Sequence, residues 1–227
     1  MTQMPGAAPD WHARADKLRL PTRAVIDGAC VDAASGRTFT RINPATGRPL
    51  ATVAECEAPD VDRAVQAARR TFEHGDWRGL GPSARKDAML KWARLIEAHA
   101  EEIALLESVE IGKPITDTLN ADAVACAATI AWYAEAVDKL YDEVAPTDKS
   151  ALAYITREPA GVVAAVIPWN YPSIIASWKI GPSLAAGNSV ILKPAEQASL
   201  ACLRLGELAI EAGLPAGAFQ VLPGTGP

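Results

Sequence analysis

Residues 161–192 read GVVAAVIPWNYPSIIASWKIGPSLAAGNSVIL. Residues 161–167 are almost continuously apolar, which is typical of a strand buried on both faces, and residues 189–192 repeat this pattern. Between them, residues 173–186 have helical spacing, and Gly187 follows as a helix terminator. A buried strand, a helix and a second buried strand predict two neighbouring parallel strands joined by a covering helix.

The same alternation continues toward the end of the chain. Residues 199–212 have a helical pattern that Gly213 ends, and residues 219–222 form a third apolar strand pattern. We therefore predict an α/β fold: an open, parallel, Rossmann-like sheet with helices on both faces. The repeat is expected to be incomplete, because the chain stops at residues 223–227 without the next helix.

The segment before this repeat predicts short strands followed by long helices. Turn signals such as Asn43-Pro44-Ala45-Thr46-Gly47 separate short strands between residues 22 and 57. Three amphipathic or alanine-rich helices are predicted, over residues 60–73, 83–109 and 115–140. A strand is predicted to follow them, over residues 150–157. Residues 1–21 are expected to form a mobile leader, and residues 22–227 one incomplete domain.

Composition excludes several classes of function. The 227 residues carry a net charge of −5 without a lysine or arginine block, which argues against nucleic acid and anionic membranes as partners. No apolar run has the length of a membrane span and no secretory signal is evident, so a cytoplasmic location is expected. The four cysteines are widely spaced and the three histidines do not cluster with them, so neither a metal site nor a disulfide framework is predicted. Cys202 lies in an apolar helical pattern and is interpreted as a small core residue.

Polar residues follow each of the three predicted strands. Asn170 follows the first strand, Lys193 and Glu196 follow the second, and Gly224 and Gly226 follow the third. Ligands of open α/β sheets bind beyond these carboxyl ends, so the three groups are expected along one rim. A carboxylate or a strong donor suits the ribose hydroxyls of a dinucleotide, and glycines permit the close backbone approach that a pyrophosphate needs.

Each of these residues also has an ordinary structural interpretation. Asn170 could close the turn before Pro172, and Lys193 with Glu196 could be a solvated pair in a loop. The two glycines lack a complete G-x-G-x-x-G pattern and could serve a turn without a ligand. The residues by themselves leave these alternatives open.

Several longer motifs resemble the aldehyde dehydrogenase superfamily. The quoted strand with its Pro-Trp-Asn-aromatic-Pro turn, the helix beginning near Trp178, and the Leu192-Lys193-Pro194-Ala195-Glu196 strand end occur in the family's order. Gly112-Lys113-Pro114 and the turn at residues 43–47 also match, so the resemblance covers almost the whole chain from about residue 22. The segment from residue 25 to 77 is most similar to the γ-glutamyl-γ-aminobutyraldehyde and betaine aldehyde types.

The resemblance implies roles for particular residues. Asn170 would donate its amide to the oxyanion of the reacting aldehyde, and Lys179 would lie near the active site and tune the general base. Lys193 and Glu196 would hold the adenosine ribose, and Gly226 would lie beside the adenine. The cofactor cleft would be lined by Val166, Ile167, Pro168 and Trp169.

The resemblance also implies an activity that this chain does not complete. The family oxidises aldehydes with NAD or NADP through a cysteine thiolate and a glutamate base, and both are expected beyond residue 227, so the catalytic domain is expected to be absent. Glu196 would repel a 2′-phosphate whereas Lys193 could attract it, so NAD is only mildly favoured over NADP. Residues 142–158 are expected to bridge subunits of a homo-oligomer. The alternative is a catalytically silent remnant that binds a nucleotide or a partner.

Overall fold

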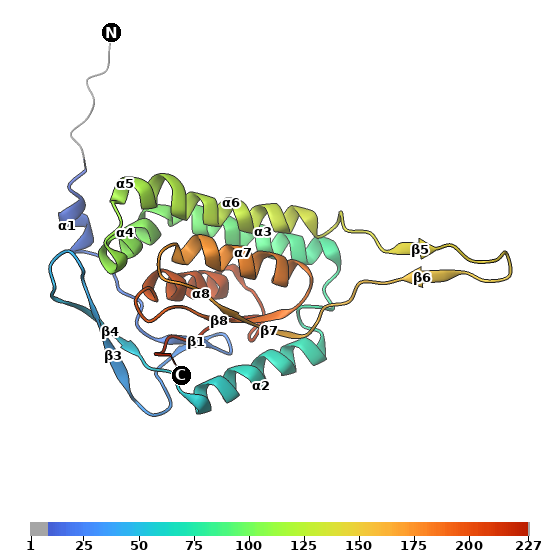
Figure 1. Ribbon diagram of the computed structural model, residues 1–227, viewed down its shortest axis with the longest axis horizontal. Helices are drawn as coiled ribbons and strands as arrows, with labels where there is room; N and C mark the ends of the chain where they lie inside the picture. The colour runs from blue at the N-terminus through green and yellow to red at the C-terminus, as the bar shows by residue number, and fades with distance from the viewer. Residues whose placement is uncertain (1–8, 227) are drawn as a thin grey trace, which may run out of the picture.

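The computed structural model describes residues 9–226 and has the predicted α/β architecture (Figure 1). Its main sheet has the strand order β2-β1-β9-β8-β7. The neighbouring strands β7, β8 and β9 run parallel, as the apolar repeats predicted. The bounds of these strands are Val162–Val166 for β7, Ser189–Lys193 for β8 and Phe219–Val221 for β9.

The sheet is mixed rather than purely parallel. Strands β1 (Ala24–Ile26) and β2 (Ala29–Val31) form a hairpin that joins the sheet beside β9 in antiparallel orientation. All three residues of β1 are fully buried, because the hairpin extends the core past β9. The sequence predicted these strands but not their membership of the main sheet, because that pairing joins Val25 to the distant Val221.

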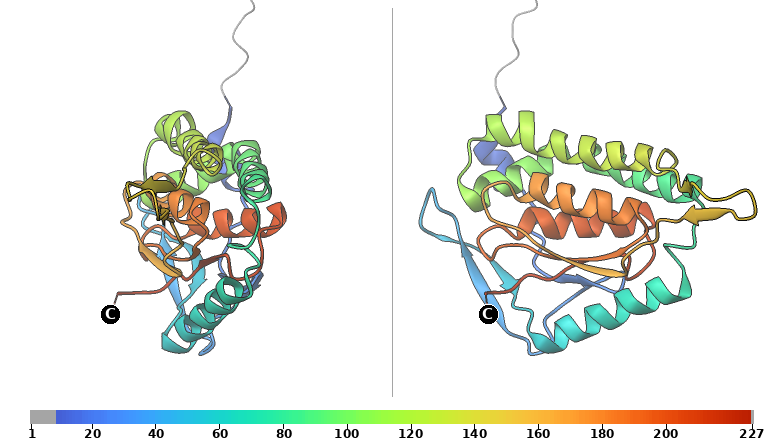
Figure 2. Two further views of the ribbon diagram at one scale, coloured as in Figure 1. Left: turned by 90° about the vertical axis from the view of Figure 1, so that its right-hand side faces the viewer. Right: turned by 45° about the vertical axis from the view of Figure 1, so that its right-hand side comes forward.

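Helices cover both faces of the sheet (Figure 2). Helices α7 (Pro172–Ala185) and α8 (Leu200–Ala212) lie against one face, and α3 (Pro82–Ala98) and α6 (Ala123–Ala136) form a second layer outside them. Helix α2 (Ala58–His74) lies on the opposite face. The buried side chain of Gln220 ties that helix to the sheet by donating to the carbonyl oxygen of Ala64 at 2.8 Å.

The single helix predicted over residues 83–109 is in fact two helices. It breaks at His99, between α3 and α4 (Ala100–Ile111). The His99 ring lies 2.8 Å from the carboxylate of Glu102, and Glu101 and Glu102 occupy the first turn of α4. Acidic residues there favour a new helix start, because the N-terminal end of a helix is partially positive.

The helix predicted over residues 115–140 is also interrupted. It begins as a single turn, α5 (Ile115–Asp117), continues as a π-helical turn (Thr118–Asp122), and then becomes α6, which ends at Ala136. Asp122, the last residue of the π turn, is fully buried. Such turns are rare and often mark functional positions.

Two hairpins lie outside the main sheet. One consists of β3 (Thr38–Ile42) and β4 (Pro49–Ala54), joined by the predicted turn at residues 43–47. The other, β5 (Glu143–Ala145) with β6 (Ala153–Ile155), projects away from the body of the molecule (Figure 1).

The leader predicted over residues 1–21 lies partly outside the described residues, which begin at residue 9. Within the described part, α1 (Trp11–Ala15) is a short helix, and Arg14 forms a 2.5 Å ion pair with Glu101. Residues 11–15 therefore contact the body of the protein through α4. None of the helices within residues 9–226 has the length and apolar character needed to cross a membrane.

Candidate functional site

The carboxyl ends of the three parallel strands lie along one rim of the sheet, as predicted. Val166 pairs with Lys193 across β7 and β8, and Leu192 pairs with Val221 across β8 and β9. The amide of Ile167 donates to the carbonyl oxygen of Lys193 at 3.2 Å, so the segments that follow β7 and β8 leave the sheet side by side. The segments that carry Asn170, Lys193 and Gly224 therefore begin at the same end of the sheet.

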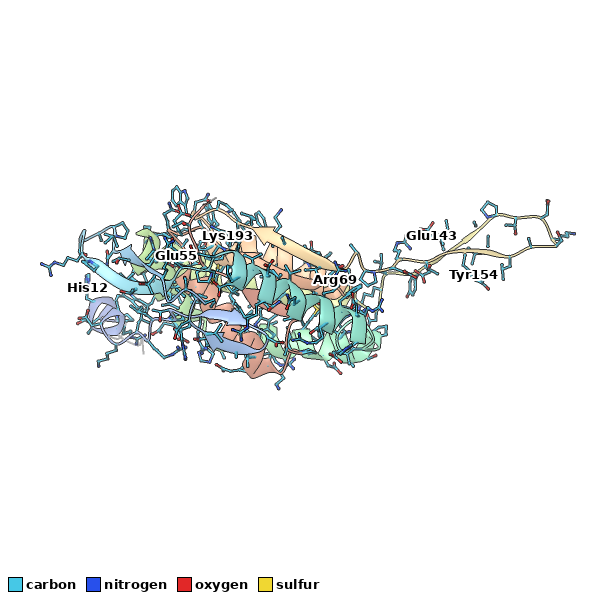
Figure 3. The ribbon with its side chains drawn as sticks, turned by 90° about the horizontal axis from the view of Figure 1, so that it is seen from below. His12, Glu55, Arg69, Glu143, Tyr154 and Lys193 are labelled. Carbon is cyan, nitrogen blue, oxygen red and sulfur yellow. The ribbon has the colours of Figure 1, made fainter. Side chains whose placement is uncertain are left out.

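A cavity of about 430 Å³ opens at the ends of β8 and β9. Figure 3 shows Lys193 and Glu55 beside each other at this end of the molecule. The walls come from β8, from the segment after β9, and from the start of α2 with the residues before it. The lining residues are Arg37, Glu55, Cys56, Glu57, Ala58, Val61, Lys193, Leu222, Pro223, Gly224, Thr225 and Gly226.

The charges around this cavity are unequally paired. Arg37 forms ion pairs with Glu55 at 3.2 Å and with Glu57 at 2.8 Å. The Lys193 ammonium group instead donates to two carbonyl oxygens, those of Gly224 at 2.9 Å and Pro194 at 3.2 Å. Among the described residues no carboxylate lies within ion-pair distance of Lys193, so this cation is available to a ligand in the cavity.

The glycine turn after β9 is packed closely against the chain before α2. The amide of Cys56 donates to the carbonyl oxygen of Pro223 at 2.9 Å, and a Cβ atom on Gly224 would lie 2.8 Å from the carbonyl oxygen of Cys56. Glycine is therefore required at position 224 for the two backbone segments to lie this close together. Gly226 lines the cavity, and a Cβ atom on it would have no other atom of residues 9–226 within 4 Å.

Glu196 differs in position from Lys193. It is half-buried and does not line the cavity, and its carboxylate accepts a 2.6 Å hydrogen bond from the side chain of Gln197. Its pKa is lowered, first by its own backbone N–H and further by the charge of Lys193. The structure therefore places Glu196 near Lys193 without bringing both into one cavity, and its ribose contact stays a prediction.

The turn after β7 carries Asn170 at the surface. Asn170 is exposed, as are Val166, Pro168 and Trp169, whereas Ile167 is buried. Trp169 lines a second cavity, of about 360 Å³, together with Arg41, Glu110 and other residues. Lys179 lies exposed on α7.

Buried carboxylates lie beneath this rim, and little in the sequence indicates them. Glu110 accepts hydrogen bonds from the backbone amides of Ser199 and Leu200, both at 2.8 Å, and pairs with Arg41 at 3.1 Å. It thereby satisfies the amides at the N-terminal end of α8. Burial raises the pKa of Glu110 to about 7, although those donors and Arg41 act in the opposite direction.

None of the four cysteines has the environment of an activated nucleophile. Cys126 and Cys202 are fully buried, and burial raises the pKa of both thiols. The interpretation of Cys202 as a small core residue is therefore confirmed. Burial also raises the pKa of Cys30, and that of Cys56 to about 12.

The thiols of Cys126 and Cys202 are expected to be inert in the folded chain. A disulfide reagent should label them only on unfolding, because the reactive thiolate is suppressed and the sulfur atoms are inaccessible. Mass spectrometry of labelled peptides, with and without denaturant, provides the measurement. Rapid labelling of either residue in a chain with native circular dichroism would contradict this assignment.

Comparison with known proteins identifies the family. The model of the aldehyde dehydrogenase family matches residues 30–227. The chain is 52% identical to an aminoacetaldehyde dehydrogenase of Pseudomonas aeruginosa, over 96% of its own length and 44% of the relative's. It is 50% identical to the NADP/NAD-dependent aldehyde dehydrogenase PuuC of Escherichia coli, over 95% of its own length and 44% of the relative's.

Solved structures agree with this comparison. A γ-glutamyl-γ-aminobutyraldehyde dehydrogenase from Burkholderia cenocepacia matches with a TM-score of 0.94 at 52% identity, covering 95% of this chain and 44% of the other. An indole-3-acetaldehyde dehydrogenase in complex with NAD+ matches with the same score and identity, covering 96% of this chain and 44% of the other. The chain thus spans less than half the length of these relatives. Within that span, fold, strand-end motifs and sequence identity agree, and the chain belongs to the aldehyde dehydrogenase family.

Proposed function

We propose that this chain supplies the adenosine part of an NAD(P) site and an oxyanion donor to an enzyme that oxidises an aldehyde to a carboxylic acid. The observation that carries the proposal is the cavity at the ends of β8 and β9, where the Lys193 ammonium group lies without a carboxylate partner among the described residues. An aminoaldehyde is the proposed substrate class, since relatives at 52% identity include enzymes named for aminoacetaldehyde and γ-glutamyl-γ-aminobutyraldehyde.

The residues of the cavity fit an adenosine ribose and its phosphates. Lys193 has a remaining N–H for a ribose hydroxyl, and the Gly224–Gly226 turn allows a backbone approach to an anionic group. Glu196 is proposed to accept from the ribose, as the motif implies, after turning from Gln197. When bound, the nicotinamide supplies the hydride acceptor.

Asn170 is proposed to act on the aldehyde rather than on the cofactor. Its neutral amide can donate to the oxygen on which negative charge develops when a thiolate attacks the carbonyl carbon. The exposed Lys179 is proposed to influence the general base through its charge. The nucleophile itself is assigned to a part of the full-length protein outside this chain, because the four thiols here have raised pKa values.

Replacing Lys193 by alanine is expected to weaken NAD binding about 10-fold to 100-fold, equivalent to one hydrogen bond from a charged donor. Isothermal titration of NAD and of NADP into the 227-residue chain measures this effect. Lys179→Ala is the matched control, because Lys179 is exposed on α7 and does not line the cavity. Equal losses in both variants would indicate a nonspecific effect of charge.

The titration also separates the proposed function from the alternative of a silent remnant. A chain that binds neither NAD nor NADP, yet has native circular dichroism, would support an interaction with another partner. Binding that survives Lys193→Ala unchanged would place the ribose elsewhere in the structure.

The β5–β6 hairpin is proposed as a contact between subunits of a homo-oligomer. It projects from the body, as Glu143 and Tyr154 show in Figure 3, and exposes large apolar side chains. Val144 is 64% exposed, Tyr154 65% and Ile155 51%. Such a concentration of exposed apolar surface on a two-stranded arm is typical of an interaction site.

A further inference from the structure

Asn170 is exposed, so other residues must hold its side chain in place if it is to act as a positioned donor. Its side chain makes no hydrogen bond to any described residue, so its position depends on the chain that follows it. Tyr171 comes next, and Ser173, three residues after Asn170, lies at the start of α7. Tyr171 contacts Lys113, which lies in the loop after α4, and Ser173 contacts the buried Glu107 on α4. With Asp122 on the π turn, which pairs with Lys113, these charged side chains form one cluster.

The cluster holds the turn at two points. The amide of Ser173 donates to one oxygen of Glu107 at 2.9 Å, within a fully buried site. The ammonium group of Lys113 lies 3.8 Å from the centre of the Tyr171 ring and 2.5 Å from a carboxylate oxygen of Asp122. One cation thus connects the aromatic residue beside Asn170 to the π turn, by a cation–π contact and an ion pair.

Three buried polar atoms in this cluster lack a hydrogen-bond partner among residues 9–226. They are Oε2 of Glu107, Oδ1 of Asp122 and Oγ of Ser173. Leaving such atoms unpaired in a dry interior is costly. The charge of Asp122 contributes to the raised pKa of Glu107, so the two carboxyl groups act on each other. A single proton between them would give a partner to the unpaired oxygen of each.

We propose that Glu107 and Asp122 share one proton and, together with Lys113, act as positioning residues for the Asn170 turn. The positioning role of these residues rests on the proposed function, in which Asn170 donates to the aldehyde oxygen. In the shared-proton state the cluster holds one protonated acid, one carboxylate and one ammonium group, so its net charge is zero. A neutral cluster of this kind can lie beneath the turn without an uncompensated buried charge.

The surroundings of Glu107 support a protonated acid at moderate pH. Burial is the main cause that raises its pKa to about 7, and the charge of Asp122 adds to this effect, while bonding to Ser173 opposes it. The other titratable groups facing it are the thiols of Cys126 on α6 and Cys202 on α8. Above this pKa, two adjacent carboxylates would face a single Lys113, and the turn should shift.

The test is a pH titration of the folded 227-residue chain by two-dimensional amide NMR, from about pH 5 to about pH 9. The backbone amides of Tyr171 and Ser173 and the side-chain amide of Asn170 should shift with one common midpoint at about 7. In Glu107→Gln these signals should stay near their low-pH positions, because glutamine resembles the protonated acid in shape and hydrogen bonding. Asp122→Asn should lower the midpoint seen at Ser173, because the neighbouring negative charge is removed.

Glu110→Gln is the matched control. Glu110 lies one turn further along α4 and also has its pKa raised by burial, but it bonds to the start of α8 instead of α7. This variant should retain the common midpoint. The proposal is overturned if Asn170 and Tyr171 do not follow the titration of Ser173, or if the midpoint survives Glu107→Gln. NAD titration of the unmodified chain tests the proposed function separately, because NAD binding does not depend on how the Asn170 turn responds to pH.

Discussion

Replacing Asn170 by alanine is expected to slow the chemical step about 10²-fold to 10³-fold in the full-length enzyme, with little change in NAD affinity. The amide would act only when charge develops on the aldehyde oxygen, so its loss raises the barrier without weakening cofactor binding. The proposed cofactor cavity is formed by other residues, around Lys193 and the turn after β9. Single-turnover kinetics is the measurement, because release of the reduced cofactor can limit kcat.

Two variants show whether the effect belongs to the donor. Asn170→Asp retains the shape of the side chain but removes its N–H groups, so it should lose as much rate as alanine. Asn43→Ala is a control for turn formation, because the Asn43 side chain accepts a 2.9 Å hydrogen bond from the amide of Ala45. It should affect stability alone. If Asn170→Ala raises only the cofactor KM and leaves the single-turnover rate intact, Asn170 serves the turn and not the oxyanion.

The fold could be predicted wherever the pattern of residues is local. The apolar runs of β7, β8 and β9 and the glycines that end the intervening helices define a parallel repeat, and the structure confirms it. One error concerns a contact between distant segments, because the pairing of β1 with β9 depends on Val25 meeting Val221. The break at His99 is a second error, and its cause is local: Glu101 and Glu102 favour a new helix start.

Some residues of the candidate site could also be predicted from the sequence, and others could not. The order of strands predicted that Asn170, Lys193 and the glycine turn would begin at one rim, because parallel strands end together. The sequence did not indicate Arg37, Glu55 or the Glu107–Asp122 pair. Charged residues are usually solvated, and only the folded arrangement shows that Glu107 and Asp122 have no exposed surface.

Replacing Gly217 by alanine is expected to destabilise the chain by about 2 to 5 kcal/mol. Gly217 has a φ of +81°, which L-residues rarely adopt, and it lies two residues before β9. A Cβ atom there would lie 2.6 Å from the carbonyl oxygen of Ala67 and would also clash with the hydroxyl of Thr71. Helix α2 would have to move away from β9, the strand that leads to the proposed cofactor cavity.

Gly36→Ala separates the two contributions to this effect. Gly36 has a similar φ of +70°, but a Cβ atom at that position would have no other atom of residues 9–226 within 4 Å. Its substitution should therefore cost only the backbone strain, about 1 to 2 kcal/mol. Denaturant unfolding of both variants gives the comparison, and the excess for Gly217→Ala measures the clash with α2. Equal losses would mean that α2 adjusts freely, and that the contact of Gly217 with Ala67 does not fix the approach of β9 to the cavity.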